Sequence, residues 1–120
     1  MDFSVEILDP IEPQNDFHNP KKYSDFSLMM SIRSLKTRPS DEVIQGMRKM
    51  FLEYCEKFGQ SRGPMGAYII AKIAQLNGCT ELYELKYGSI KDTATLVTRR
   101  KADRMWRRAC DEFGWKFSAA

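Results

Sequence analysis

Residues 67–76, AYIIAKIAQL, constrain the fold of this 120-residue chain more than any other segment. In a helix they are apolar around most of the circumference, with only Lys72 and Gln75 as polar exceptions. Such a helix has to be covered on several sides. Pro64 suits a first helical position, and the Asn-Gly pair after residue 76 favours a stop. We therefore expect a central helix that contacts both another helix and a sheet.

A second helix is predicted over residues 41–58. Ser40 is a suitable N-cap, and the acidic pair Asp41 and Glu42 complements the positive end of the helix dipole. Gly59 favours a stop. The apolar positions then recur at steps of three and four, which is typical of an amphipathic helix: Val43, Ile44, Met47, Met50, Phe51, Tyr54, Cys55 and Phe58.

Three segments favour β-strands. Residues 25–33, DFSLMMSIR, alternate between two faces, one of them apolar, which is the pattern of a half-buried strand. Residues 81–88, ELYELKYG, could form a strand or a helical turn, and their pattern weakly favours the strand. Residues 93–98, TATLVT, contain the β-branched side chains that strands favour. The predicted fold class is α+β, with a small, mainly antiparallel sheet packed by three helices.

The N-terminal segment differs from the rest in charge. Residues 1–19 carry five acidic side chains and no Lys or Arg, whereas the whole chain has a net charge of +3. Pro10, Pro13 and Pro20 interrupt residues 1–24. We predict an extended acidic arm over residues 1–24 and a single globular domain over residues 25–120. The segregation of charge indicates an anionic partner for the basic body, although a solvated tail on a mildly basic domain explains it equally well.

The basic charge concentrates near the C-terminus, in a predicted helix that begins at about Arg99 and stops at Gly114. Its apolar residues form one stripe with helical period, and Trp106 lies on that stripe rather than among the arginines. We expect this stripe to pack on the core and the opposite face to meet solvent. Arginine forks bind phosphate and carboxylate groups. The candidate anion- or nucleic-acid-binding residues are Arg99, Arg100, Lys101, Arg104, Arg107 and Arg108. Secondary candidates are Lys36, Arg38 and Arg62.

No pattern of catalytic or metal-binding residues stands out. His18 is the only histidine and lies in the arm, and the three cysteines are scattered, so neither a histidine-based triad nor a zinc site is indicated. Residues 59–66, GQSRGPMG, lack the Gly-Lys-Ser/Thr ending of a phosphate-binding loop. We expect no enzyme activity and no cofactor. The odd cysteine count favours a reducing compartment, and the absence of a signal peptide or a membrane-spanning segment favours an intracellular protein, cytoplasmic or nuclear.

The order of several segments resembles that of rhabdovirus matrix proteins. NPKKYSDFSLMMSIRS is followed by a Pro-bearing link, the helix at 41–58 and GPMGAYIIAKIAQLNG, so the likeness covers about residues 19–80. The resemblance implies a viral, non-enzymatic protein that self-associates, condenses a ribonucleoprotein and contacts membrane. The arm is acidic where that family's arm is basic, and the chain has no Pro-Pro-x-Tyr motif.

The sequence supports two hypotheses for function. The first is a binding and assembly protein, matrix-like, whose basic C-terminal helix face engages a ribonucleoprotein, RNA or an anionic membrane. The second is a protein–protein adaptor or regulatory antagonist that docks a partner protein through its acidic arm. The arm residues that would make that contact are Phe3, Ile7 and Phe17.

Overall fold

Helices are the only regular elements in the described part of the chain. The computed structural model describes residues 18–87 and 93–116, with side chains for residues 18–84 and 99–116. Within these ranges there is no strand, so the predicted α+β class with an antiparallel sheet is wrong and the fold is a small all-α bundle. Its helices are α2 (Pro20–Ile32), α3 (Asp41–Phe58), α4 (Gly63–Leu76), α5 (Thr80–Tyr87) and α6 (Thr93–Phe113).

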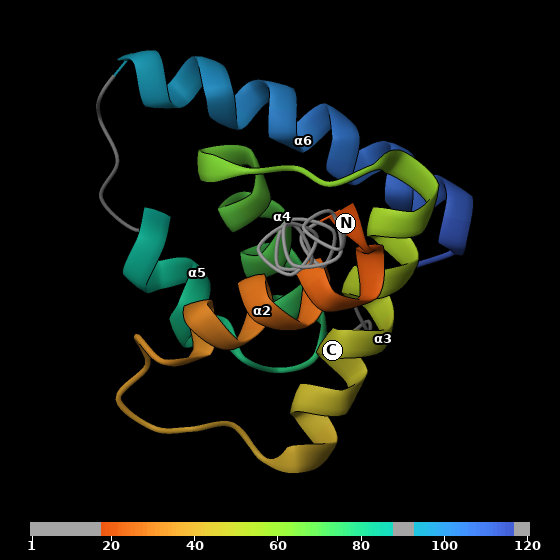
Figure 1. Cartoon of the computed structure of the whole chain (residues 1–120). Helices are drawn as coiled ribbons and strands as arrows, with labels where there is room; N and C mark the ends of the chain where they lie inside the picture. The colour runs from red at the N-terminus through yellow and green to blue at the C-terminus, as the bar shows by residue number, and fades with distance from the viewer. Residues whose placement is uncertain (1–17, 88–92, 117–120) are drawn as a thin grey trace, which may run out of the picture.

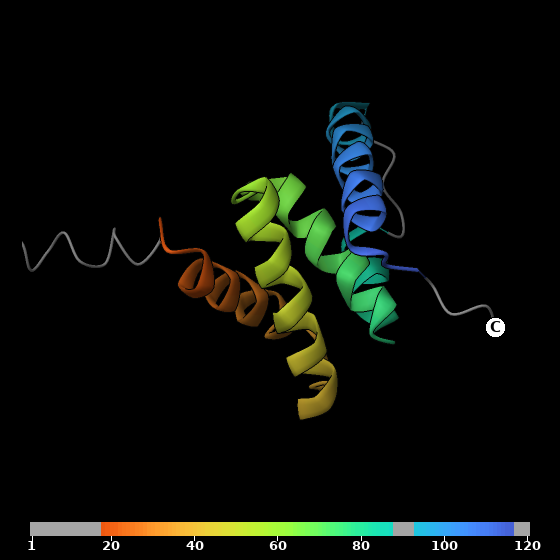
Figure 2. The same cartoon turned by 90° about the vertical axis from the view of Figure 1, so that its right-hand side faces the viewer.

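Helix α4 lies at the centre, as its apolar sequence predicts. It contacts α2, α3, α5 and α6, and most of its side chains are buried. Figures 1 and 2 together show α2 and α3 on one side of α4, with α6 on the other. The predicted contact with another helix is therefore confirmed, while helices take the place of the expected sheet. Ile69, Ala71, Ile73 and Ala74 have no exposed surface at all.

Residues 25–33, predicted as a strand, belong to α2 and its C-terminal cap. Asn19 starts the helix, because its side chain accepts a hydrogen bond from the backbone of Lys21 at 3.0 Å and a proline follows at the first helical position. The alternating apolar set includes positions four residues apart, which a helix also places on one face. Leu28 and Ile32 are buried on that face, whereas Phe26 and Met30 are 53% and 49% exposed.

The other two predicted strands are helical as well. Residues 81–87 lie in α5, where Leu82 is buried and the helix packs on α4. Residues 93–98 form the first turns of α6. Strand preference of β-branched residues is weak and depends on context. Here the segment continues directly into the strongly amphipathic residues after 98, so one long helix replaces a strand followed by a short helix.

The prediction for α3 is confirmed in its bounds, its N-cap and its C-terminal glycine. The Ser40 hydroxyl accepts a hydrogen bond from the backbone of Val43 at 3.3 Å, and Gly59 ends the helix with a φ of 87°, a conformation that favours glycine. Phe51 and Tyr54 on its buried face continue an aromatic cluster that includes Tyr23 from α2. This cluster joins α2 to α3.

The proposed arm lies mostly outside the described residues. Helix α2 begins at Pro20, so residues 20–24 are helical. Phe3, Ile7 and Phe17 lie outside the described residues. Among the helices that are described, none is long and apolar enough to cross a membrane.

Replacing Trp106 by alanine tests how α6 is held. Trp106 is 5% exposed and packs in the core, so its loss should lower the free energy of unfolding by about 3–5 kcal/mol. Urea unfolding followed by far-ultraviolet circular dichroism measures this change. Arg104→Ala on the exposed face is the control and should change stability by less than about 0.5 kcal/mol. Equal effects of the two changes would mean that α6 does not dock on the core through Trp106.

Candidate functional site

Helix α6 is fixed to the core by its apolar stripe. Ala102 and Ala109 have no exposed surface and Trp106 has 5%, so the predicted placement of Trp106 in the core is confirmed. The two alanines are small enough to let α6 approach α4 closely, and these helices pack against each other. Near its end, the Phe113 ring meets the Phe58 ring of α3 edge-on at 6.0 Å. The opposite side of α6 is therefore held toward solvent in a defined orientation.

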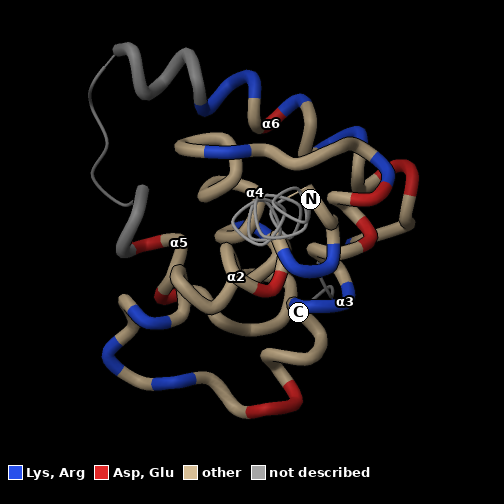
Figure 3. Tube along the Cα trace, in the orientation of Figure 1, with Lys and Arg blue, Asp and Glu red and all other residues tan. Residues whose placement is uncertain are grey.

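Five cations share that outward side, and we call them the basic face: Arg100, Lys101, Arg104, Arg107 and Arg108. All five are exposed, and Figure 3 shows Lys and Arg recurring along α6. From Arg100 to Arg108 the helix advances about 12 Å. Residues 99–116 contain seven basic and three acidic side chains, a net charge of +4. Several like charges are three or four positions apart, which costs helix stability unless an anion lies among them.

The members of the basic face differ in what they contact. Arg107 forms an ion pair with Asp103 one turn earlier, with 2.9 Å between nitrogen and oxygen, and the Arg108 guanidinium lies 5.5 Å from the centre of the Phe58 ring. Arg100, Lys101 and Arg104 form no ion pair with any described residue. These three cations are the most available to an external anion.

Arg99 has a different environment from the basic face. It is partly buried, donates a hydrogen bond to the Tyr83 hydroxyl of α5, and its guanidinium lies 5.7 Å from the centre of the Tyr83 ring. The Lys72 ammonium of α4 lies 5.5 Å from the same ring centre. Arg99 therefore also links α6 to α5.

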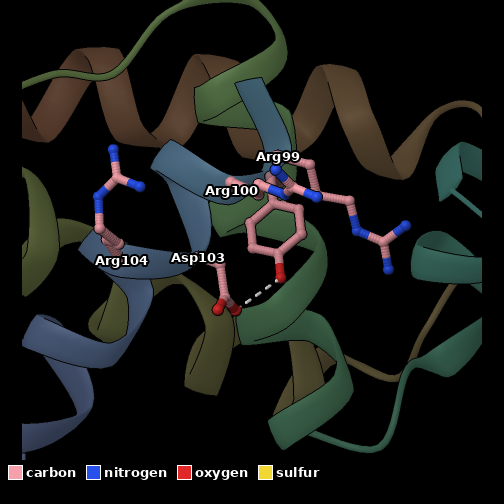
Figure 4. A pocket seen from close by; sticks show the side chains of 5 residues that line it. Arg99, Arg100, Asp103 and Arg104 are labelled. Atoms are coloured by element: carbon pink, nitrogen blue, oxygen red, sulfur yellow. Dashed lines mark hydrogen bonds between the residues drawn. The ribbon is translucent and has the colours of Figure 1, made fainter. Parts of the chain in front are cut away.

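An open hollow of about 460 Å³ lies beside the start of the basic face (Figure 4). Its lining residues are Tyr68, Arg99, Arg100, Asp103 and Arg104. The Tyr68 hydroxyl of α4 donates a hydrogen bond to Oδ1 of Asp103 at 3.0 Å. Oδ2 of Asp103 forms the ion pair with Arg107. In Figure 4 the Asp103 carboxylate points toward that hydroxyl and Arg104 extends in another direction. The hollow thus combines three guanidinium groups with one oriented carboxylate.

Burial shifts the proton equilibria around this hollow. It raises the pKa of Tyr68, and the hydrogen bond to Asp103 raises that pKa further, so the hydroxyl stays protonated and able to donate at neutral pH. Burial lowers the pKa of Lys72, and the nearby Asp103 carboxylate opposes that effect. The Lys72 ammonium also lies 5.9 Å from the centre of the Trp106 ring. Tyr68, which lines the hollow and belongs to the core, therefore joins the two.

The secondary basic candidates do not join this surface. Lys36 and Arg38 lie in the connection between α2 and α3, which Figures 1 and 2 place at the opposite end of the molecule from α6. Arg38 forms an ion pair with Asp41 at 2.9 Å. Arg62 precedes α4 and lies 5.2 Å from the centre of the Tyr23 ring on α2. The structure therefore gathers five of the six α6 candidates on the basic face, places Arg99 in the adjoining hollow, and brings none of these three to that surface.

Residue pattern alone does not identify the polar residues of the hollow. Asp103 and Arg107 are four positions apart, a spacing that suggests an ion pair on a helix. Nothing in the sequence links Asp103 to Tyr68, because their contact depends on the packing of α4 against α6. Tyr68 fits an apolar helix equally well as a core residue, and it is 4% exposed.

The described residues offer no group of three or more His, Cys, Asp or Glu side chains that could hold a metal ion. Each of the three cysteines is a free thiol whose pKa is raised by burial. For Cys55 burial raises the pKa to about 12. A thiol of this kind is a weak nucleophile at neutral pH.

The chain matches no protein-family model, no curated protein sequence and no solved structure. Its function is therefore inferred from its own residues and geometry.

The Cys55 thiol should make stability depend on pH. The thiol ionises near pH 9 in the unfolded chain, whereas in the folded protein its pKa is about 12. Between these values the unfolded state loses a proton that the folded state keeps, so the free energy of unfolding falls by up to about 1.4 kcal/mol per pH unit. Urea unfolding at pH 8, 9 and 10 with reductant measures this fall.

Cys55→Ala removes this contribution, so its stability should fall less steeply above pH 9 than that of the unchanged protein. Cys79→Ala is the control, because Cys79 is only partly buried. If the unchanged protein and Cys55→Ala follow parallel curves from pH 8 to 10, burial does not raise the pKa of the Cys55 thiol.

Proposed function

We propose that this protein binds RNA, alone or within a ribonucleoprotein, through the basic face of α6, and acts without catalysis. The observation that carries the proposal is the set of three exposed cations, Arg100, Lys101 and Arg104, that have no ion-pair partner among the described residues. These three cations lie within about one turn, and the whole basic face from Arg100 to Arg108 spans about two turns of helix, a spacing that suits a polymer with regularly repeated phosphates. A matrix-like role in compacting a viral ribonucleoprotein would use the same surface.

The docking of α6 favours RNA over a membrane as the anion. An interfacial helix binds a bilayer by inserting its apolar side between the lipids. The apolar side of α6 is occupied by the core, since Ala102, Trp106 and Ala109 are buried. Only electrostatic attraction to anionic lipid would remain for this helix, whereas arginine forks on a solvated face meet the requirements for binding phosphates.

Charge reversal at the three cations that form no ion pair with described residues tests the proposal. Arg100→Glu, Lys101→Glu and Arg104→Glu together should weaken binding to single-stranded RNA at least tenfold in 100 mM salt, because three phosphate contacts become repulsive. The plot of log K against log salt concentration has a negative slope, and this slope should become shallower by about 2, because three phosphate contacts are lost. Fluorescence anisotropy with a labelled oligonucleotide measures both quantities, and circular dichroism confirms that the variant is folded.

A matched control carries the same change of net charge at another place. Lys21, Arg33 and Lys49 are exposed, lie on α2, its C-terminal cap and α3, and form no ion pair with described residues. Their replacement by Glu should reduce affinity much less. Similar losses for both triple variants would show that net charge alone governs binding. Tighter binding of the unchanged protein to anionic vesicles than to RNA would overturn the choice of partner.

A protein–protein adaptor is the second candidate. The observation that favours it is the exposure of Phe26 and Met30, one turn apart on α2, the helix that follows the acidic arm. Large apolar side chains exposed together are frequent at protein interfaces. In this case a partner protein would contact the arm and the adjoining surface of α2.

Deletion of residues 1–17 distinguishes the two candidates. The deletion leaves the Asn19 cap of α2 intact and removes five negative charges and no Lys or Arg. An RNA-binding protein should then bind RNA as tightly or more tightly, since the removed charges repel phosphate. Anisotropy with the same oligonucleotide, and a pull-down with and without nuclease, measure the outcome. Loss of a nuclease-resistant protein partner, with no RNA binding in either form, would favour the adaptor.

A further inference from the structure

The Asp103 carboxylate is out of place in a surface that only attracts phosphate. It lies within the hollow lined by Arg99, Arg100 and Arg104, where its negative charge weakens the attraction for any anion. Its position is fixed from two sides, because the Tyr68 hydroxyl donates a hydrogen bond to one oxygen and the Arg107 guanidinium forms an ion pair with the other. A carboxylate held in this way can select hydrogen-bond donors on a ligand.

Asp103 retains room to accept further hydrogen bonds. A carboxylate has about four acceptor sites, and the structure shows one partner on each oxygen. The side chain is 31% exposed, so the remaining sites are partly open to the hollow. The volume of about 460 Å³ lies within the range of sites for small organic ligands. A ligand that combines an anionic group with adjacent hydrogen-bond donors would match both the arginines and the carboxylate that line the hollow.

On the basis of the proposed RNA binding, we infer that the hollow holds one guanine nucleotide of the bound strand. The guanine N1–H and N2–H groups donate to the two oxygens of Asp103, and a phosphate beside that nucleotide lies between Arg100 and Arg104. The base reaches the hollow because the strand is single, so that its Watson–Crick edge is free.

The pattern of donors makes guanine the matching base. Guanine presents two adjacent donors on its Watson–Crick edge, which fit the two oxygens of one carboxylate. Uracil presents one donor between two carbonyl oxygens, and the carboxylate repels those oxygens. Adenine and cytosine each present an amino group beside a ring-nitrogen acceptor. Recognition of the base relies on hydrogen bonds and charge rather than on stacking. The Tyr68 ring is buried at 4% exposure, and Arg99 and Lys72 already lie against the Tyr83 ring.

The test compares nine-nucleotide RNAs that differ at one position. The unchanged protein is titrated with U9 and with the same strand carrying a central guanosine, and anisotropy gives the dissociation constants. We expect about tenfold tighter binding of the guanosine strand, the discrimination typical of one bidentate contact. Central inosine, which lacks the N2 amino group, should bind with intermediate affinity, and central adenosine should bind like U9.

Two asparagine variants separate recognition from charge. Asp103→Asn keeps an oxygen for Tyr68 but places an amide N–H₂ where guanine needs an acceptor, so it should abolish the preference for guanosine. Asp111→Asn removes the same charge from an exposed position on the same helix. It should strengthen binding to both strands and leave the preference intact. Arg100→Gln should weaken binding to both strands by a similar factor and also leave the preference intact.

The outcomes separate this inference from the proposed function. RNA binding without any preference for guanosine would overturn the guanine site while leaving RNA binding in place. The same conclusion would hold if Asp103→Asn strengthened binding to both strands, as expected for Asp111→Asn, and kept the preference. Absence of binding to every strand would overturn both. The inosine comparison uses the unchanged protein, so it decides the matter even if a variant fails to fold.

Discussion

The packing of α6 on α4 is the interaction on which the rest of this molecule depends. Helix α4 is apolar around most of its circumference, and α6 together with α5 covers the side that α2 and α3 leave open. The same contact buries Trp106 and turns five cations outward. It also brings Tyr68 of α4 to Asp103 of α6, which creates the hollow. The same packing of α6 on α4 therefore buries core side chains and assembles the candidate site.

The elements that can be predicted from sequence are those whose signals are local. Helix α3 has a cap, a stripe and a stop, and it forms as predicted. The stripe of α6 is clear from Ala102 onward. The strand prediction for residues 25–33 is wrong because apolar positions at every second residue include positions four apart, and the Asn19 cap that selects the helix lies before that segment.

The candidate site divides in the same way. Its cations can be found from sequence, because a run of arginines opposite an apolar stripe needs only helical geometry. The contacts that Arg99 and Arg108 make with other helices cannot be found in this way, since the Tyr83 hydroxyl belongs to α5 and the Phe58 ring to α3. Lys36 and Arg38 share only their charge type with the site, because the connection between α2 and α3 lies at the far end of the molecule from α6 (Figures 1 and 2), and Arg62 lies against the Tyr23 ring of α2.

The crowding of like charges along α6 has a consequence for how salt acts on the protein. Arg100, Arg104 and Arg108 follow one another at four-residue intervals and repel across each turn. Added salt screens that repulsion and stabilises the free helix, whereas it weakens the attraction between the same side chains and a polyanion. A bound strand would do for the helix what salt does. Under the proposed function, the stability of the fold and the affinity for a polyanion would therefore respond to ionic strength in opposite directions, and occupancy of the basic face would add to the thermal stability of the bundle.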